Sequence, residues 1–181
     1  MYPIVRLIKE GLKARRMPPL APLDAHVSYH RCWPQDIDQF IEMNNGRILT
    51  ILDLGRTGLA QRVGLLRALA KNRWGLTVAG SSVMYRKRIR PFVKFRVVSK
   101  CVGWDERYMY LEQSLWIGTD SDVQALYSTA VTDRNGIVRP ERLMATMGMQ
   151  ESSPTLPDWV QNWIVADKTR PWPPHDDGSS V

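Results

Sequence analysis

The feature that most constrains the fold is a long apolar stretch from about Asn45 to Asn72, which few charges interrupt. Its apolar residues recur at helical spacing over a broad face, which predicts a long helix. These residues are Ile48, Leu49, Leu52, Leu59, Val63, Leu66 and Leu69. Gly55 and Gly58 predict a bend or break near its middle. A helix with so many apolar side chains must be covered by other elements, most simply by a curved sheet.

From Thr77 onward the pattern changes to the alternation of apolar and polar residues that is typical of strands. Turn-forming residues divide this region into four predicted strands, at 77–90, 93–103, 107–117 and 123–133. Because the connections are short, we expect an antiparallel meander. An alternating segment at 26–33 adds a fifth strand. The predicted class is α+β, with a five-stranded antiparallel sheet wrapped around a long central helix.

The segments outside this core predict extra terminal helices. We divide the chain into an N-terminal amphipathic helix and linker at 1–19, a main domain at 20–150, and a C-terminal helix with a flexible tail at 151–181. Within these, helices are expected at 140–147 and 157–167. A turn is expected from Asp133 to Gly136, and the tail should begin at Pro171.

The N-terminal helix, at residues 4–16, has an apolar stripe made by Ile4, Val5, Ile8 and Leu12, while most of its other side chains are basic. One interpretation is a helix that lies on a membrane surface or clamps phosphate groups. The other is that the stripe docks on the body of the protein. Docking is favoured because the stripe is short and Gly11 weakens the helix.

Charge and cysteine content limit the partners and the compartment. The net charge is +7 and the pI about 9.7. This excess of positive charge favours an anionic partner, which could be a phosphate-bearing ligand, an anionic membrane or nucleic acid. The alternative is that the charge only keeps the protein surface soluble. Cys32 and Cys101 have no metal-binding spacing, and free thiols in a reducing compartment are the simplest interpretation, although a disulfide stays open. Without a secretory signal or an apolar run of about 20 residues, we expect a cytoplasmic protein.

The candidate catalytic side chains lie just before the long helix. No nucleophile elbow, phosphate loop, dinucleotide fingerprint or metal-spaced cluster is present in the sequence. Instead, Asp36, Asp38, Glu42, Asn44 and Asn45 gather within ten residues. A carboxylate there can activate water or attack an acyl carbon, and N–H groups at a helix start can hold an oxyanion. The alternative is that these residues only cap a helical turn.

Two motifs resemble hotdog-fold thioesterases related to 4-hydroxybenzoyl-CoA thioesterase. The string D-I-D-Q-F-I-E-M-N-N-G-R-I at 36–48 is similar to the signature that family carries before its helix. The strings M-N-N-G-R-I-L at 43–49 and G-W-D-E-R-Y-M-Y-L-E at 103–112 look closest to the thioesterase-superfamily-member-6-like branch. The resemblance covers residues 26–133 and implies a hotdog fold and hydrolysis of an acyl-CoA thioester.

The resemblance also implies roles for single residues. Asp38 stands where the family has its nucleophile or general base, Asp36 where it has a structural carboxylate, and Asn45 where it has an asparagine at the helix start. Glu42 replaces a common histidine and could assist as a second carboxylate, or it could simply face solvent. Ile48 and Ile41 replace a common tyrosine and glycine.

Further expectations concern the substrate and the assembly. The resemblance implies that the thioester oxygen meets a backbone N–H near Gly75 of a neighbouring subunit, unless Gly75 is a helix C-cap. Arg86, Arg88 and Arg90 would share one strand face and meet the phosphates of coenzyme A, or lie on a solvated edge. We expect a homodimer or larger homo-oligomer, no nucleic-acid partner, and no cofactor beyond the coenzyme A of the substrate. A catalytically weak or inactive module that binds acyl-CoA or a protein stays open, as does a dehydratase with His30 as base.

Overall fold

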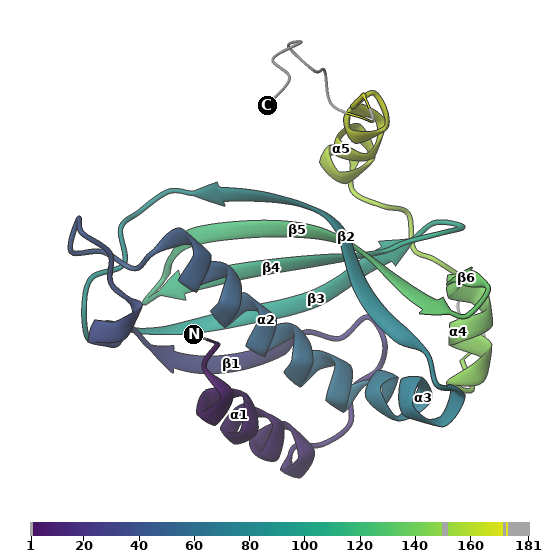
Figure 1. Ribbon diagram of the computed structural model, residues 1–181, viewed down its shortest axis with the longest axis horizontal. Helices are drawn as coiled ribbons and strands as arrows, with labels where there is room; N and C mark the ends of the chain where they lie inside the picture. Colours follow the sequence, from purple (N-terminus) through teal and green to yellow (C-terminus); the bar gives the residue numbers. More distant parts are fainter. Residues whose placement is uncertain (1, 150–151, 172, 174–181) are drawn as a thin grey trace, which may run out of the picture.

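The computed structural model describes residues 2–149, 152–171 and 173, and within them six strands form one antiparallel sheet that curls around a central helix (Figure 1). The strands are β1 (His26–Arg31), β2 (Gly75–Tyr85), β3 (Lys94–Trp104), β4 (Met109–Ile117), β5 (Asp120–Asp133) and β6 (Gly136–Val138). The helices are α1 (Ile4–Arg16), α2 (Asn45–Arg62), α3 (Leu65–Asn72), α4 (Pro140–Thr146) and α5 (Asp158–Lys168), with a 3-10 turn at Pro34–Asp36. The predicted α+β hotdog class is confirmed.

The strand order, β1-β3-β4-β5-β2, differs from the meander of four consecutive strands. The antiparallel run β3-β4-β5 is as predicted, but β2 pairs with β5 at the far edge of the sheet. The chain therefore crosses the end of the sheet between β2 and β3, and this crossing uses residues 86–93. The side chain of Ile89 is buried in the core and fixes the position of this crossing segment. The Ile89 carbonyl accepts a hydrogen bond from the Met43 N–H at 2.9 Å. The prediction that the strand continues to residue 90 was wrong for this reason.

The turn predicted from Asp133 to Gly136 is present, and Asp133 pairs with Gly136 across it. It begins a hairpin to β6, a sixth strand that the sequence pattern did not reveal because three residues are too few to show alternation.

The central helix is interrupted at a different place from the one predicted. The break between α2 and α3 falls at Val63 and Gly64, where Gly64 adopts a φ of 82°. Gly55 and Gly58 lie inside α2 and face the sheet. A Cβ at Gly58 would lie 2.4 Å from Nε2 of His26, and one at Gly55 would lie 2.8 Å from the Ser99 hydroxyl. These two glycines therefore allow close approach of α2 to the sheet, and they do not bend it.

Helix α1 packs against α2 by a face that the sequence interpretation did not choose (Figure 1). Its buried residues are Glu10 and Ala14, and Leu7 packs against the core. The apolar stripe from Ile4 to Leu12 points into solvent, so the expectation that this stripe docks on the body was wrong. The buried Glu10 carboxylate is compensated by Lys13 at 2.9 Å, which makes a partly polar contact face possible.

The remaining elements cover the outer face and one end of the sheet. Helix α5 packs Val160, Trp163 and Ile164 against Tyr110 and Leu126, whereas Trp159, predicted for the same face, is exposed. The predicted helix at 140–147 is α4. Of the tail predicted from residue 171, residues 172 and 174–181 lie outside the described part of the chain. Both cysteines are free and buried, and burial raises the pKa of each thiol to about 11.

Candidate active site

The segment before α2 is organised by Asp36, whose carboxylate is buried. It accepts hydrogen bonds from Arg6 at 2.8 Å and from the Trp33 N–H at 2.9 Å, and it pairs with Arg47 at 3.2 Å. These contacts tie α1, the 3-10 turn and the first turn of α2 together. Asp36 therefore has the structural position that the resemblance implied, and its carboxylate is fully engaged by cations.

Asp38 lies in a tight turn two residues further on. Its carboxylate accepts the Phe40 N–H at 2.8 Å, and its backbone N–H donates to the Glu42 carbonyl at 2.9 Å. Ile41 has a φ of 60° within this turn, a conformation that β-branched residues seldom adopt. The side chain is half-buried, so it is fixed by the turn and still open to a reactant from outside.

Glu42 closes the same turn and pairs with Arg88 at 3.0 Å. Of the predicted phosphate-binding residues, Arg88 is thereby placed beside the carboxylates. Arg86 and Arg90 are exposed in the same crossing segment, but because this segment is not a strand, the three arginines do not share a strand face. The crossing instead presents Arg86, Lys87, Arg88 and Arg90 as an exposed basic margin, in which Arg88 pairs with Glu42 of the Asp38 turn and Lys87 pairs with Asp120.

Two adjacent asparagines begin α2. Asn44 is its N-cap, and its side chain accepts the N–H groups of Gly46 at 2.9 Å and Arg47 at 3.3 Å. Asn45 is the first helical residue and its side chain is exposed. The cap interpretation therefore applies to Asn44, while Asn45 is available to a ligand at the positive end of the helix dipole.

Gly75 is the first residue of β2 and not a helix C-cap, since Arg73 ends α3 in the left-handed conformation. In the described chain the outer edge of β2 has no strand partner, and residues 75–79 are all exposed. Apolar side chains of β2 are exposed as well: Leu76, Val78, Met84 and Tyr85. An open strand edge with apolar side chains favours pairing with another strand.

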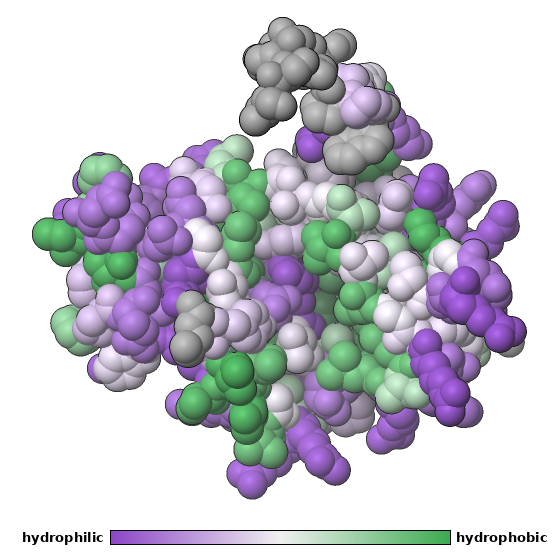
Figure 2. Space-filling view, viewed as in Figure 1, coloured by the Kyte–Doolittle hydropathy of each residue, from purple (hydrophilic) through white to green (hydrophobic). Residues whose placement is uncertain are grey.

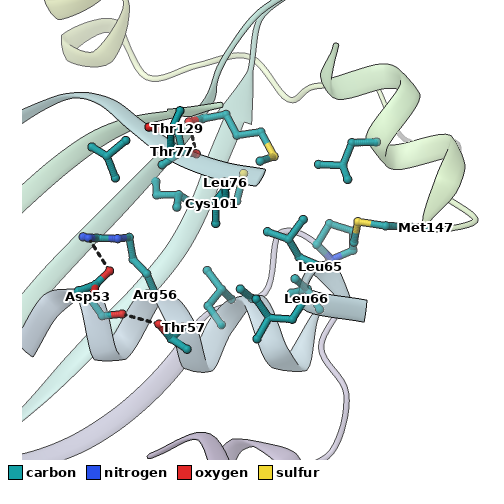
Figure 3. A pocket seen from close by; sticks show the side chains of 18 of the residues that line it. Asp53, Arg56, Thr57, Leu65, Leu66, Leu76, Thr77, Cys101, Thr129 and Met147 are labelled. Atoms are coloured by element: carbon teal, nitrogen blue, oxygen red, sulfur yellow. Dashed lines mark hydrogen bonds and ion pairs between the residues drawn. The ribbon is translucent and has the colours of Figure 1, made fainter. Parts of the chain in front are cut away.

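The structure also contains an apolar cavity of about 170 Å³ that the sequence did not reveal (Figure 3). It lies between the C-terminal half of α2, helices α3 and α4, and the first residues of β2. Its lining includes Ala60, Leu65, Leu66, Leu76, Val78, Cys101, Met109, Leu111, Leu143 and Met147. Such a predominantly apolar space, which lies beside the open outer edge of β2, is suited to a hydrophobic group.

One end of this cavity is polar, where Asp53, Arg56 and Thr57 project from α2 (Figure 3). Arg56 pairs with Asp53 at 3.0 Å, donates to Gln113 Oε1 at 2.8 Å and lies 4.0 Å from the centroid of the Tyr127 ring. Sequence reasoning missed this cluster, although Asp53 and Arg56 are the only charges between residues 48 and 61. Charged residues one turn apart on an otherwise apolar helix were the available signal.

The predicted carboxylates and the cavity lie at opposite ends of α2. From Asn45 to Arg56 the helix rises about 16 Å at 1.5 Å per residue. The Asp38 turn contacts the crossing segment that follows the C-terminal end of β2, because Met43 bonds Ile89 and Glu42 pairs with Arg88. The cavity, by contrast, contacts the N-terminal end of β2 at Leu76 and Val78. Within one chain, the two features therefore do not form a single site.

The second motif, at 103–112, serves the fold. Asp105 accepts the Tyr110 hydroxyl at 2.6 Å and the N–H groups of Arg107 and Tyr108 at 2.8 Å each, which closes the turn between β3 and β4. Burial acts to raise the pKa of Asp105, but these hydrogen bonds prevail and lower it. Trp104 and Tyr110 are buried. The motif therefore stabilises the hairpin under α5, while its Met109 and Leu111 line the apolar cavity.

His30 is not placed for proton transfer at the cavity. Its ring lies beside α1, with Nε2 2.8 Å from the Ser28 hydroxyl and the ring stacked on Phe95. Burial lowers the pKa of His30 to about 4. The charge of Glu10 acts to raise this pKa, whereas the charges of Lys13, Arg6 and His26 lower it further. Among the described residues, no group of three or more His, Cys, Asp or Glu side chains is placed to hold a metal ion.

His30 should make the fold sensitive to mild acid. An unfolded histidine binds a proton below about pH 6.5, whereas folded His30 stays neutral down to about 4. Its stabilising effect is therefore complete above pH 6.5 and is lost as the pH falls toward 4. We expect the free energy of unfolding, measured in urea, to drop by about 2 kcal/mol between pH 7 and pH 5. His30→Gln should reduce this drop, and an unchanged drop would exclude His30 as its source.

Comparison with known proteins adds independent information. A family model described as the thioesterase-like superfamily matches residues 32–164. Protein THEM6 of Drosophila melanogaster is 31% identical over 144 residues, covering 79% of this chain and 74% of that protein.

Solved structures show the same fold at low sequence identity. The probable thioesterase YbaW from Escherichia coli aligns with a TM-score of 0.63 at 14% identity, over 67% of this chain and 95% of that chain. Slr0204, a 1,4-dihydroxy-2-naphthoyl-CoA thioesterase from Synechocystis, aligns with a TM-score of 0.59 at 7% identity, over 68% of this chain and 95% of that chain.

Proposed function

Because the chain belongs to the thioesterase-like superfamily, we propose that it is an acyl-CoA thioesterase, which hydrolyses its substrate to a free acid and coenzyme A. The observation that supports this proposal most is that the candidate site consists of two separate parts. A turn with a half-buried carboxylate and a basic margin lies near one end of β2, and an apolar cavity lies near the other end. The two provide what an acyl-CoA needs, a reactive carboxylate, cations for its phosphates and space for its acyl group.

A homodimer formed through β2 would bring these halves together. Antiparallel pairing of two β2 edges around a twofold axis places the N-terminal end of one strand against the C-terminal end of the other. The Asp38 turn of one subunit then meets the Leu76 and Val78 rim of the partner's cavity. The exposure of residues 75–79 in the single chain supports this interface.

In the reaction we propose, Asp38 accepts a proton from water as the water oxygen attacks the thioester carbonyl, or its carboxylate attacks that carbon directly. The carbonyl oxygen becomes an oxyanion, which the N–H of Gly75 and the start of α2 at Asn45 would stabilise. In the general-base route the C–S bond then breaks, the acid is released, and the proton that Asp38 took from water ends on the departing sulfur of coenzyme A. In the direct route the C–S bond breaks to leave an anhydride between the acyl group and Asp38, and water then hydrolyses this anhydride, which frees the acid, restores the Asp38 carboxylate and supplies the proton for the coenzyme A thiolate. With both cysteines free, we place the reaction in the reducing cytoplasm.

The direct test is release of free thiol from a panel of acyl-CoA esters with aliphatic and aromatic acyl groups. Hydrolysis of at least one ester is the expected result. The alternative is a module that binds acyl-CoA without turnover, and the engagement of Glu42 by Arg88 favours it. It predicts that acyl-CoA raises the melting temperature while no thiol is released. Absence of both turnover and stabilisation would refute the proposal.

A mixing experiment tests whether the site is shared between subunits. Leu66→Trp should fill part of the cavity, and Asp38→Asn should remove the reactive carboxylate, so each homodimer is expected to be inactive. Mixed dimers keep one site with both halves intact. After subunit exchange, about a quarter of the wild-type thiol release should return, because half of the dimers are mixed and each has one intact site. No recovery despite measured exchange would show that each subunit carries a complete site.

A further inference from the structure

Helix α1 carries an apolar face that nothing in the described chain covers. The exposed fractions are 60% for Ile4, 82% for Val5, 57% for Ile8 and 52% for Leu12. Figure 2 shows this face as a hydrophobic patch over α1, at the lower edge of the molecule. Four large aliphatic residues on one helical face, all more than half exposed, are unusual for a helix whose other face is already packed on the protein.

Basic residues flank this apolar face. At 100° per residue, Lys9 and Arg16 follow directly beside Val5 around the helix, and Lys13 lies beyond them. All three are exposed, and the last turn of α1 also carries Arg15. An apolar stripe bordered by lysine and arginine is the arrangement of helices that lie in the interface of a bilayer, with the long basic side chains reaching the headgroups.

The basic flank continues into a hollow of about 530 Å³ between α1 and the β1–β3 pair. Five cations line it: Arg6, Lys9, Arg31, Lys94 and Arg96. The single carboxylate of its lining, Glu10, is already paired with Lys13. Charge complementarity therefore favours an anionic occupant on this side of the molecule.

Aromatic side chains border the same hollow. Trp33 is 41% exposed beside Arg31, whose guanidinium lies 5.4 Å from its ring centroid, and Trp116 lies 5.2 Å from Arg96. Tryptophan next to arginine is typical of the layer where the bilayer meets water.

We propose that α1 binds the surface of an anionic phospholipid membrane, with its apolar face in the acyl boundary and its basic flank against the headgroups. An anionic bilayer accounts for the apolar face and the adjoining cations together, whereas a second copy of α1 would bring its own Lys9, Lys13 and Arg16 against these same cations. Among the described residues no helix is long and apolar enough to span a membrane, and the attachment that we propose is to the bilayer surface. It is independent of catalysis by Asp38.

The experiment is flotation of the full chain with vesicles of phosphatidylcholine alone and of phosphatidylcholine with phosphatidylglycerol at about three to one. The wild type should float with the anionic vesicles, and salt should release it because screening weakens the headgroup contacts. Val5→Asp should lower the partition coefficient by about tenfold or more, since it removes an apolar group and adds a repelled charge. Lys9→Gln with Arg16→Gln should lower it by a similar factor.

Val165→Asp is the matched control, because Val165 is also an exposed helical valine, at 64%, and lies on α5. It should leave flotation unchanged, and neither aspartate variant should alter thermal unfolding. Equal flotation with neutral and anionic vesicles, or equal loss in Val5→Asp and Val165→Asp, would overturn the proposal. If Val5→Asp instead changed only the oligomeric mass measured by light scattering, the face would be a protein interface and the proposal would be wrong.

Discussion

Asp38→Asn should lower kcat for acyl-CoA hydrolysis by a factor of about 10² to 10⁴, the usual contribution of a positioned acid or base. The amide cannot take a proton from water, and it is a poor nucleophile. Its oxygen can still accept the Phe40 N–H, so the turn that holds residue 38 should persist. The measurement is thiol release under saturating substrate, together with the thermal unfolding curve.

Asp158→Asn provides the control, because it removes the same charge from an exposed position on α5. Its kcat should equal that of the wild type. KM should change little in Asp38→Asn if the carboxylate acts only in the transition state. A variant that retained activity within a few fold would assign the reaction to another group, and Asp53, at the polar end of the cavity, would be the next residue to test.

Gly58→Ala should destabilise the fold by about 2 kcal/mol, although alanine favours helices by about 1 kcal/mol over glycine. The new Cβ would lie 2.4 Å from Nε2 of His26, and this ring cannot move freely. It is buried, and its Nδ1 is 3.1 Å from an Arg62 nitrogen that is itself fixed near Pro18. Either α2 or β1 must therefore shift.

Gly11→Ala is the matched substitution in α1, where a Cβ would meet nothing within 4 Å. It should stabilise the protein by about 0.5–1 kcal/mol. Urea denaturation of both variants tests the pair, with an expected difference of about 3 kcal/mol between them. Stabilisation by both alanines would show that α2 does not approach β1 so closely.

The parts of the fold that depend on local pattern could be predicted from the sequence. The apolar period from residue 45 onward identified the central helix, and the range predicted for the N-terminal helix, 4–16, is that of α1. Strand pairing could not be predicted, because alternation shows that a strand exists and not which edge it joins. The alternating arginines at 86–90 resembled a strand, yet the chain uses them to cross the end of the sheet.

Of the candidate site, only the group of carboxylates could be predicted from the sequence. The carboxylates of Asp36, Asp38 and Glu42 are close in sequence and could be identified as a group. The cavity depends on side chains from seven separate helices and strands, so no local pattern describes it. The face by which α1 packs on the protein was also predicted wrongly, because it includes a charged residue. A buried Glu10 looks unfavourable until Lys13 is seen to compensate it.

The position of β2 at the far edge of the sheet has a consequence for synthesis on the ribosome. Helix α2 emerges before every strand that covers it except β1, and β2 must wait for β5, its partner, some forty to fifty residues later along the chain. Such non-local pairing slows folding. A nascent chain of this protein therefore exposes an apolar helix, α2, and a strand that has not yet paired, β2, for several seconds of translation. Binding by a chaperone would matter most during this interval.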